Sequence, residues 1–212
     1  MNYTKTLREY CKTTPWKIFD VSYEMSARFK MVPYKTLLKV MNRLEEEGLV
    51  ETISKGIFLI KNEDPGKDPI VSHYAAEGRG VVVGYAMYNK YKVTEHTQGP
   101  IVIYTNMMMT ETKNIGDKYV LIRFPIDFSR HIQRLVSALE IIENGPNIIG
   151  SEQSMRAVAL QNLLSTGYVD ECLPAIIKHH RYKYSTMVAL SSVLSDMGIK
   201  NDVLNIYKKE CL

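Results

Sequence analysis

The sequence predicts an α+β protein in two parts: three helices and a β-hairpin first, then a small mixed sheet with helices and a C-terminal helical bundle. Three observations lead to this prediction. Apolar residues recur at helical spacing in several separate segments. Short runs rich in β-branched and aromatic residues are bounded by glycine or proline, as strands are. The excess of positive charge is confined to the beginning of the chain.

The composition is typical of a folded protein without a membrane span. The chain has 212 residues, 45% hydrophobic and 24% charged, which is enough apolar side chain for one or two cores. No apolar run approaches the roughly 20 residues of a membrane-spanning helix, and the N-terminus is charged where a signal peptide would be apolar. We therefore expect a cytoplasmic protein. The three cysteines are odd in number and far apart, so we expect free thiols at Cys11, Cys172 and Cys211.

The charge divides the chain after Lys61. Residues 1–61 hold 11 basic and 7 acidic residues, a net charge of 11 − 7 = +4. The rest holds 27 − 11 = 16 basic and 23 − 7 = 16 acidic residues, a net charge of zero. The loop Asn62–Pro69, with two prolines and a glycine, suits a domain boundary. We predict a polyanion-binding domain over residues 1–63 and a neutral domain over residues 67–212.

The first two helices are predicted from spacing and from a cap. Aromatic and leucine side chains recur at helical spacing over residues 3–10, which indicates a short first helix. Asp20 or Ser22 is suited to cap a second helix that runs to about Phe29. Between the two helices lies a compact apolar patch, formed by Trp16, Ile18 and Phe19.

A third helix and a hairpin complete the first domain. Pro33 suits the first position of a helix that runs to about Glu47, and Gly48 suits its C-terminal end. The segments 49–53 and 57–60, separated by Ser54, Lys55 and Gly56, are typical of two hairpin strands. Three helices followed by a hairpin form a winged helix-turn-helix. The stripe that would pack on the first two helices consists of Leu37, Val40, Met41 and Leu44.

The third helix carries a polar face that suits the major groove of DNA. The N-terminal residues of such a helix reach base edges, while lysine and arginine neutralise phosphates. Arg43 also has an intrahelical explanation, since Glu46 and Glu47 follow it at pairing distance. The alternative for the whole set is the solvated surface of a protein-binding domain. We predict contacts to bases or phosphates from Tyr34, Lys35 and Lys39, to a base from Asn42 and to a phosphate from Lys30. Lys55, at the hairpin tip, would lie over the DNA backbone or the minor groove. Thr36, in the N-terminal turn, and Arg43 complete the predicted DNA-binding set.

The second part alternates short apolar runs with helical patterns. Strands are predicted at 101–106 and 118–124, with turns or a weak strand between them. A short helix is expected from Ser72, an apolar run over 80–84 and a helix over 85–91. The remaining chain predicts a helix around residues 132–142, a helix capped by Ser151, and further helices near 173–180, 185–197 and 202–209.

The sequence contains no pattern of a known catalytic or cofactor site. The glycines of Gly78–Gly84 precede an apolar run instead of following a strand, so a tight turn explains them better than a dinucleotide site. Phosphate-loop, zinc-protease, serine-hydrolase and Cys-x-x-Cys patterns do not occur. The run Met107–Met109 is interpreted as loop packing, and His179–His180 as a pair near a helix end. We therefore predict no catalytic residue, no cofactor and no metal.

A family resemblance rests on two stretches of the chain. The first is the run LLKVMNRLEEEGLVETISKGIFLI, which joins the third helix, an RLxxxGL pattern and a hairpin in that order. It resembles the N-terminal winged-helix domain of AbiEi-type antitoxins, the transcriptional regulators of type IV toxin–antitoxin systems. The second is TEHTQGPIVIYTN with the strand and helices after it, which is similar to the C-terminal antitoxin domain of that family.

The resemblance implies a two-domain DNA-binding regulator rather than an enzyme. Such a protein represses its own promoter at inverted repeats in double-stranded DNA. It also antagonises a nucleotidyltransferase-like toxin encoded beside it, which need not involve a stable complex, and it has no membrane partner. Two alternatives remain open: a single-gene transcription factor whose second domain senses a small molecule, and a winged-helix module that binds proteins.

Overall fold

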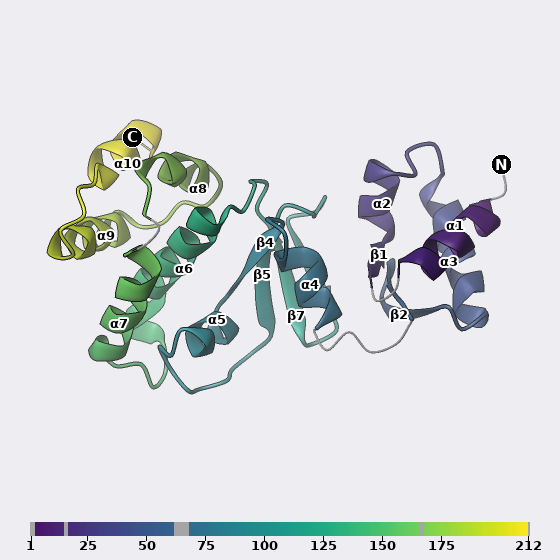
Figure 1. Cartoon of the computed structure of the whole chain (residues 1–212), viewed down its shortest axis with the longest axis horizontal. Helices are drawn as coiled ribbons and strands as arrows, with labels where there is room; N and C mark the ends of the chain where they lie inside the picture. The colour runs from purple at the N-terminus through teal and green to yellow at the C-terminus, as the bar shows by residue number, and fades with distance from the viewer. Residues whose placement is uncertain (1–2, 15–16, 62–67, 166–167, 212) are drawn as a thin grey trace.

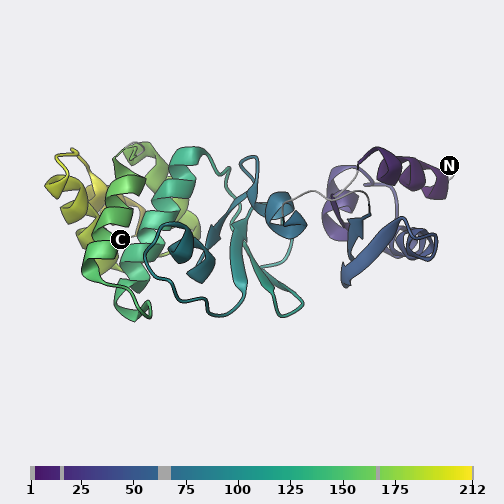
Figure 2. The same cartoon turned by 60° about the horizontal axis from the view of Figure 1, so that its bottom comes forward.

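The structure, a computed structural model, is an α+β protein, as predicted, and it describes residues 3–14, 17–61, 68–165 and 168–211. We refer to residues 3–61 as the N-terminal unit and to residues 68–211 as the second unit. Figures 1 and 2 show an elongated molecule with the two termini at opposite ends and a second sheet between the N-terminal unit and a bundle of helices. Trp16 and most of the predicted boundary loop lie outside the described residues, so the division into domains stays a prediction.

Three helices form in the N-terminal unit where the sequence predicts them. The Asp20 carboxylate caps the second helix by accepting hydrogen bonds from the backbone N–H groups of Ser22 at 2.9 Å and Tyr23 at 3.4 Å. Pro33 directly precedes the third helix, where its missing N–H leaves no helical hydrogen bond unmade. The helices are α1 (Tyr3–Thr13), α2 (Val21–Ala27) and α3 (Tyr34–Glu46).

The hairpin is also present, and it belongs to a sheet of three strands. Its strands β2 (Val50–Ser54) and β3 (Ile57–Ile60) are joined by a tight turn at Lys55 and Gly56. The third strand, β1 (Ile18–Asp20), pairs antiparallel with β3 and gives the order β1-β3-β2. The sequence analysis interpreted residues 18 and 19 only as an apolar patch. In the structure, both side chains are buried because they face two different cores.

The second unit contains a four-stranded mixed sheet. Strand β5 pairs antiparallel with β4 and parallel with β7, and β6 pairs antiparallel with β7, which gives the order β4-β5-β7-β6. The apolar run at 80–83 and the stretch between the two predicted strands are therefore both strands. The elements are α4 (Pro69–Ala75), β4 (Gly80–Val83), α5 (Tyr85–Lys90), β5 (Ile101–Thr105), β6 (Thr112–Ile115) and β7 (Tyr119–Arg123).

The C-terminal part is helical, as predicted, apart from one cap. Ser151 does not cap α7: Glu152 holds that position without a side-chain hydrogen bond, and the Ser151 hydroxyl accepts from the Arg156 guanidinium. Within the described ranges, no helix combines the length and the apolar character that crossing a membrane requires. The helices are α6 (Arg130–Asn144), α7 (Gln153–Leu164), α8 (Leu173–His179), α9 (Tyr184–Asp196) and α10 (Val203–Cys211), with short 3₁₀ turns at Gly145–Asn147 and Asp170–Cys172.

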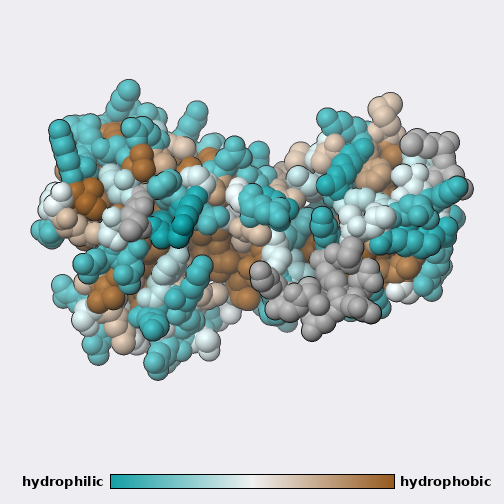
Figure 3. Space-filling view, in the orientation of Figure 1, coloured by the Kyte–Doolittle hydropathy of each residue, from teal (hydrophilic) through white to brown (hydrophobic). Residues whose placement is uncertain are grey.

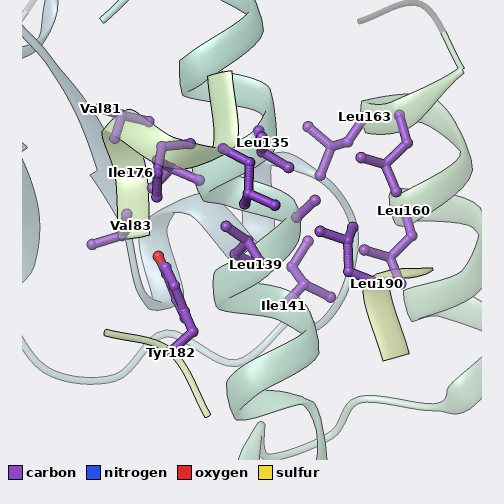
Figure 4. Packing of buried hydrophobic residues seen from close by; sticks show 14 of the residues in the cluster. Val81, Val83, Leu135, Leu139, Ile141, Leu160, Leu163, Ile176, Tyr182 and Leu190 are labelled. Carbon is purple, nitrogen blue, oxygen red and sulfur yellow. The ribbon is translucent and has the colours of Figure 1, made fainter. Parts of the chain in front are cut away.

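The second sheet has a core on each face because side chains alternate along its strands. Val81 and Val83 of β4 face the helical bundle, where α6 is the central helix. Figure 4 shows Leu135 and Leu139 of α6 among these strand residues and the residues of α7 to α9. On the opposite face, residues such as Ile103 pack against α4 and the N-terminal unit. The sheet is therefore the middle layer of the protein.

The two units touch through a small polar and apolar contact, seen as a narrow neck in Figure 3. Ile18 and Ile57 of the N-terminal sheet share a buried cluster with Tyr74 of α4. The Tyr74 hydroxyl donates to Asp20 Oδ2 at 2.8 Å, and Lys113 Nζ lies 3.3 Å from the same oxygen. Because Asp20 is only 4% exposed, these two partners take the place of water at Oδ2. This carboxylate therefore joins the two units.

His73 of α4 lies beside this contact and makes the stability of the protein depend on pH. Its ring meets the rings of Tyr23 and Tyr74 edge-on, and its Nε2 atom is buried with no hydrogen-bond partner among the described residues. Burial, helped by the positive charge of Arg79, lowers the pKa of His73 from 6.5 to about 4.

Acidification is expected to destabilise the fold through His73. Between pH 6.5 and pH 4, the unfolded chain binds a proton at this imidazole that the folded protein does not, so stability falls as the pH falls. The free energy of unfolding in urea should decrease by about 2 kcal/mol from pH 7 to pH 5 through this group alone. His73→Gln should reduce this pH dependence, whereas His131→Gln, at an exposed position of α6, should not. An equal effect of both substitutions would contradict the assignment.

Candidate nucleic-acid interface

Helix α3 presents three different faces to its surroundings. Leu37, Val40 and Leu44 point into the core formed with α1 and α2. A second stripe faces the hairpin: the Glu45 carboxylate accepts hydrogen bonds from the backbone N–H and the hydroxyl of Thr52, each at 2.7 Å. The third face is left to solvent. Because two faces are fixed by packing, the orientation of the third face is fixed as well.

The exposed face gathers most of the predicted contact residues. Lys35, Lys39, Asn42 and Arg43 are spaced four, seven and eight residues from the first, which places them along one side of the helix, and all four are exposed. The exposed Glu46 ends this stripe at the C-terminal side. Up to this acid, the exposed face is therefore cationic and polar.

The other four predicted residues lie around this face in different environments. Lys30 is exposed in the turn between α2 and α3, and Lys55 is exposed in the hairpin turn. Thr36 is half-buried in the first turn of α3. Tyr34 is also half-buried and packs against the core of the N-terminal unit. The structure thus brings Lys35, Lys39, Asn42 and Arg43 together, with Lys30 and Lys55 on separate loops.

The predicted ion pair of Arg43 with the glutamates after it is wrong. Glu47 binds Arg8 of α1 instead, through two hydrogen bonds of 2.8 Å and 2.5 Å, and these bonds lower the pKa of the Glu47 carboxyl. Glu45 is engaged by Thr52 of β2. Glu47, one of the two predicted partners, is thus drawn away by a tertiary contact that local spacing does not reveal, and the other, Glu46, forms no salt bridge with Arg43 among the described residues. The intrahelical explanation for Arg43 therefore falls, and its charge stays available at the surface.

Salt bridges between described residues engage several basic residues of the N-terminal unit, and the predicted contact residues are not among those residues. Arg8, Lys12, Arg28 and Lys61 each pair with a glutamate of the same unit. Within the described part of the chain, no acid forms a salt bridge with any of the five predicted contact residues that carry a positive charge. These five are Lys30, Lys35, Lys39, Arg43 and Lys55. The positive charge without an acidic partner thus lies where an anionic ligand can reach it.

The hairpin turn is placed against the start of α3 by Tyr34. A Cβ atom added to Gly56 would lie 2.7 Å from the Tyr34 hydroxyl, so the ring rests directly on the backbone of the turn. Gly56 also has a φ of +74°, a conformation that favours glycine. Both the close approach of Tyr34 and the positive φ therefore favour glycine at position 56. The same contact keeps Lys55, the neighbouring residue, close to the N-terminal end of α3.

The second unit approaches the same end of the interface. A hollow of about 320 Å³ lies between the hairpin turn and the segment Met107–Lys113, and Tyr34 and Lys55 line it. Met107 and Met108 are buried in the cluster between the units, in agreement with loop packing, but they also line this hollow together with Met109, which is 64% exposed. The sequence analysis did not predict that Met107–Lys113 lies beside the hairpin turn, because about fifty residues of sequence separate the two segments.

Met31 is a further residue that sequence reasoning missed. It is 89% exposed in the turn between α2 and α3, next to Lys30. A fully exposed apolar side chain beside a cationic surface is suited to contact with a partner, for example with the methyl group of a thymine. The one feature of the sequence that could have identified Met31 as a contact residue is its position as an apolar residue in a predicted turn.

The remaining candidates do not assemble into a further site. His179 ends α8, and the ring of His180 lies 4.5 Å from that of Tyr182, so the pair is at a helix end as expected. Among the described residues, no three histidine, cysteine, aspartate or glutamate side chains lie close enough to hold a metal ion. No protein-family model matches the chain, and no curated protein matches it either.

The fit of Tyr34 against the hairpin turn can be tested by adding a methyl group. Gly56→Ala should destabilise the protein more than Gly48→Ala. Both positions have a positive φ, costing roughly 1 kcal/mol, but only residue 56 would also meet the Tyr34 hydroxyl, at a further cost of roughly 1 to 3 kcal/mol. Adding Tyr34→Phe to Gly56→Ala should recover part of the loss. Urea unfolding measures all three, and equal destabilisation by the two alanines would contradict the contact.

Proposed function

We propose that the N-terminal unit is a winged helix-turn-helix domain that binds double-stranded DNA and makes this protein a transcriptional regulator. In this proposal α2 and α3 form the helix-turn-helix, α3 is the recognition helix, and the hairpin β2–β3 is the wing. The protein acts in the cytoplasm, without a catalytic step. The observation that carries the proposal is the set of unpaired cations on and around the exposed face of α3.

The arrangement of these cations favours DNA over a protein partner. A recognition helix inserts its exposed face into the major groove, so its first turns reach base edges and flanking cations reach phosphates. Lys35 and Asn42 would read bases from α3, while Lys30 and Lys55 would contact the backbone on either side. A protein-binding surface of the same size would contain more apolar and fewer charged residues at its centre. Here Met31 is the one large apolar side chain among the described exposed residues of the unit.

The family resemblance extends the proposal to autorepression and to an antitoxin role. The chain would repress its own promoter at inverted repeats and counteract a nucleotidyltransferase-like toxin encoded beside it, without a need for a stable complex. Cells that express this toxin together with the full chain should survive, and death of these cells would reject the antitoxin role while leaving DNA binding untouched. In that case a single-gene regulator with a ligand-sensing second unit becomes the better interpretation.

Substitutions on α3 and on the wing should have different effects on DNA binding. Lys35→Ala and Asn42→Ala should each weaken binding to the protein's own promoter by about 1 to 3 kcal/mol and reduce discrimination against random duplex DNA. Lys55→Ala should weaken binding to both DNAs about equally, because a backbone contact carries no sequence information. Fluorescence anisotropy with two duplexes of equal length gives these affinities.

The matched control is Lys200→Ala, which removes the same charge from an exposed position before α10. It should leave both affinities unchanged. Loss of promoter binding with Lys200→Ala but not with Lys35→Ala would place the DNA on the second unit and overturn the proposal.

A further inference from the structure

A pocket in the second unit combines tyrosine rings with a buried carboxylate. It measures about 280 Å³ and opens between β4, β5, α5 and the end of α6. Tyr85, Tyr88 and Tyr104 line it together with Glu140 and Asn144. The rings of Tyr85 and Tyr88 are 5.7 Å apart and nearly perpendicular, at 77°, so they form two adjoining walls.

The carboxylate of Glu140 is held in place by neutral donors alone. Oε1 accepts hydrogen bonds from the Tyr104 hydroxyl at 3.1 Å and the Tyr182 hydroxyl at 3.0 Å, and Oε2 accepts from the Asn144 amide at 3.2 Å. A carboxylate offers about four acceptor positions, so these bonds leave one open. Figure 4 shows Tyr182 beside α6, with its hydroxyl group directed toward Val83 of β4.

Glu140 has no lysine or arginine partner among the described residues, although it is only 7% exposed. Burial raises the pKa of its carboxyl, while the hydrogen bond from Tyr182, the electrostatic effect of nearby His180 and the hydrogen bond from Tyr104 oppose this rise. The ring of His180 packs on Tyr182 and Tyr104, but His180 forms no salt bridge with a described acid. A buried carboxylate without a cationic partner is costly, and an apolar residue would serve stability better.

Three features of the pocket favour a positively charged ligand. The faces of aromatic rings attract cations within about 6 Å, and three tyrosines surround the pocket. Glu140 supplies carboxyl oxygens at its inner end, and a cation bound beside them would favour the ionised form. Asn144 is the last residue of α6, whose C-terminal carbonyl dipoles also favour a cation. The groups that contact the Glu140 carboxylate are neutral hydroxyl and amide donors, so no described residue forms a salt bridge with it and a cationic ligand can take that place.

We propose that this pocket binds a small organic ammonium ion, with its charged head between the tyrosine rings and Glu140. The volume suits a ligand of a few heavy atoms rather than a nucleotide. The aromatic walls favour an alkylated ammonium over a hydrated metal ion, because they replace water with ring faces. This site is separate from the DNA interface and does not depend on it.

Choline is a suitable probe, with its neutral carbon analogue as the control. In this analogue a tert-butyl group replaces the trimethylammonium group, so the shape is kept and the charge is lost. Calorimetric titration of the full chain at constant ionic strength should show binding of choline at least about tenfold tighter than binding of the analogue, as a cation–π and charge-dependent site requires. Failure of choline to bind, or equal binding of both compounds, would overturn the proposal.

Variants locate the binding within the molecule. Glu140→Gln should weaken choline binding at least about tenfold, since an amide of the same shape has no charge. Tyr85→Ala, at the half-buried mouth of the pocket, should weaken it without disturbing the Glu140 network. Glu152→Gln removes the same charge from an exposed position and should have no effect. Choline binding that survives both Glu140→Gln and Tyr85→Ala would place the ligand elsewhere and contradict the site. These titrations contain no DNA, so their failure would leave the proposed regulator function intact.

Discussion

The buried carboxylate of Asp20 is the constraint on which the arrangement of the molecule depends. Its residue ends β1, so its position is set by the pairing of that strand with β3. One carboxylate oxygen caps α2, and the other accepts from Tyr74 of the second unit and lies against Lys113. A strand end, a helix start and the contact between the units are thus satisfied by one side chain. Because α2 packs on α3, the same carboxylate also influences where the exposed cationic face points.

The elements with strong local signals were predictable from the sequence. Helix α3 has an apolar stripe of period 3.6, a proline before it and a glycine after it, and the hairpin has two β-rich runs around a glycine turn. Strand β1 was missed because it is three residues long and its partner β3 lies about forty residues further along the chain. The ion pair expected between Arg43 and Glu47 was wrong for a related reason. Glu47 pairs instead with Arg8, which is distant in sequence but adjacent to Glu47 in space.

The residue types of the candidate interface were predictable, but their arrangement was only partly so. The spacing of Lys35, Lys39 and Asn42 places them on one helical face whatever the tertiary structure. That Tyr34 rests on Gly56, and that the methionine segment of the second unit lies beside the hairpin turn, depends on packing between distant segments. The tyrosine pocket gave no sequence signal, since Tyr104, Glu140 and Tyr182 come from separate elements and follow no known motif.

The central claim is that the N-terminal unit carries a surface for the phosphates of duplex DNA, and salt dependence tests it most directly. The affinity of the full chain for a mixed-sequence duplex should be measured from 50 to 200 mM salt. If the five cations of α3, its preceding turn and the wing each contact one phosphate, the logarithm of the association constant should fall against the logarithm of the salt concentration with a slope of about −4.5. An affinity that does not change with salt, or no binding at the lowest salt, would contradict the account.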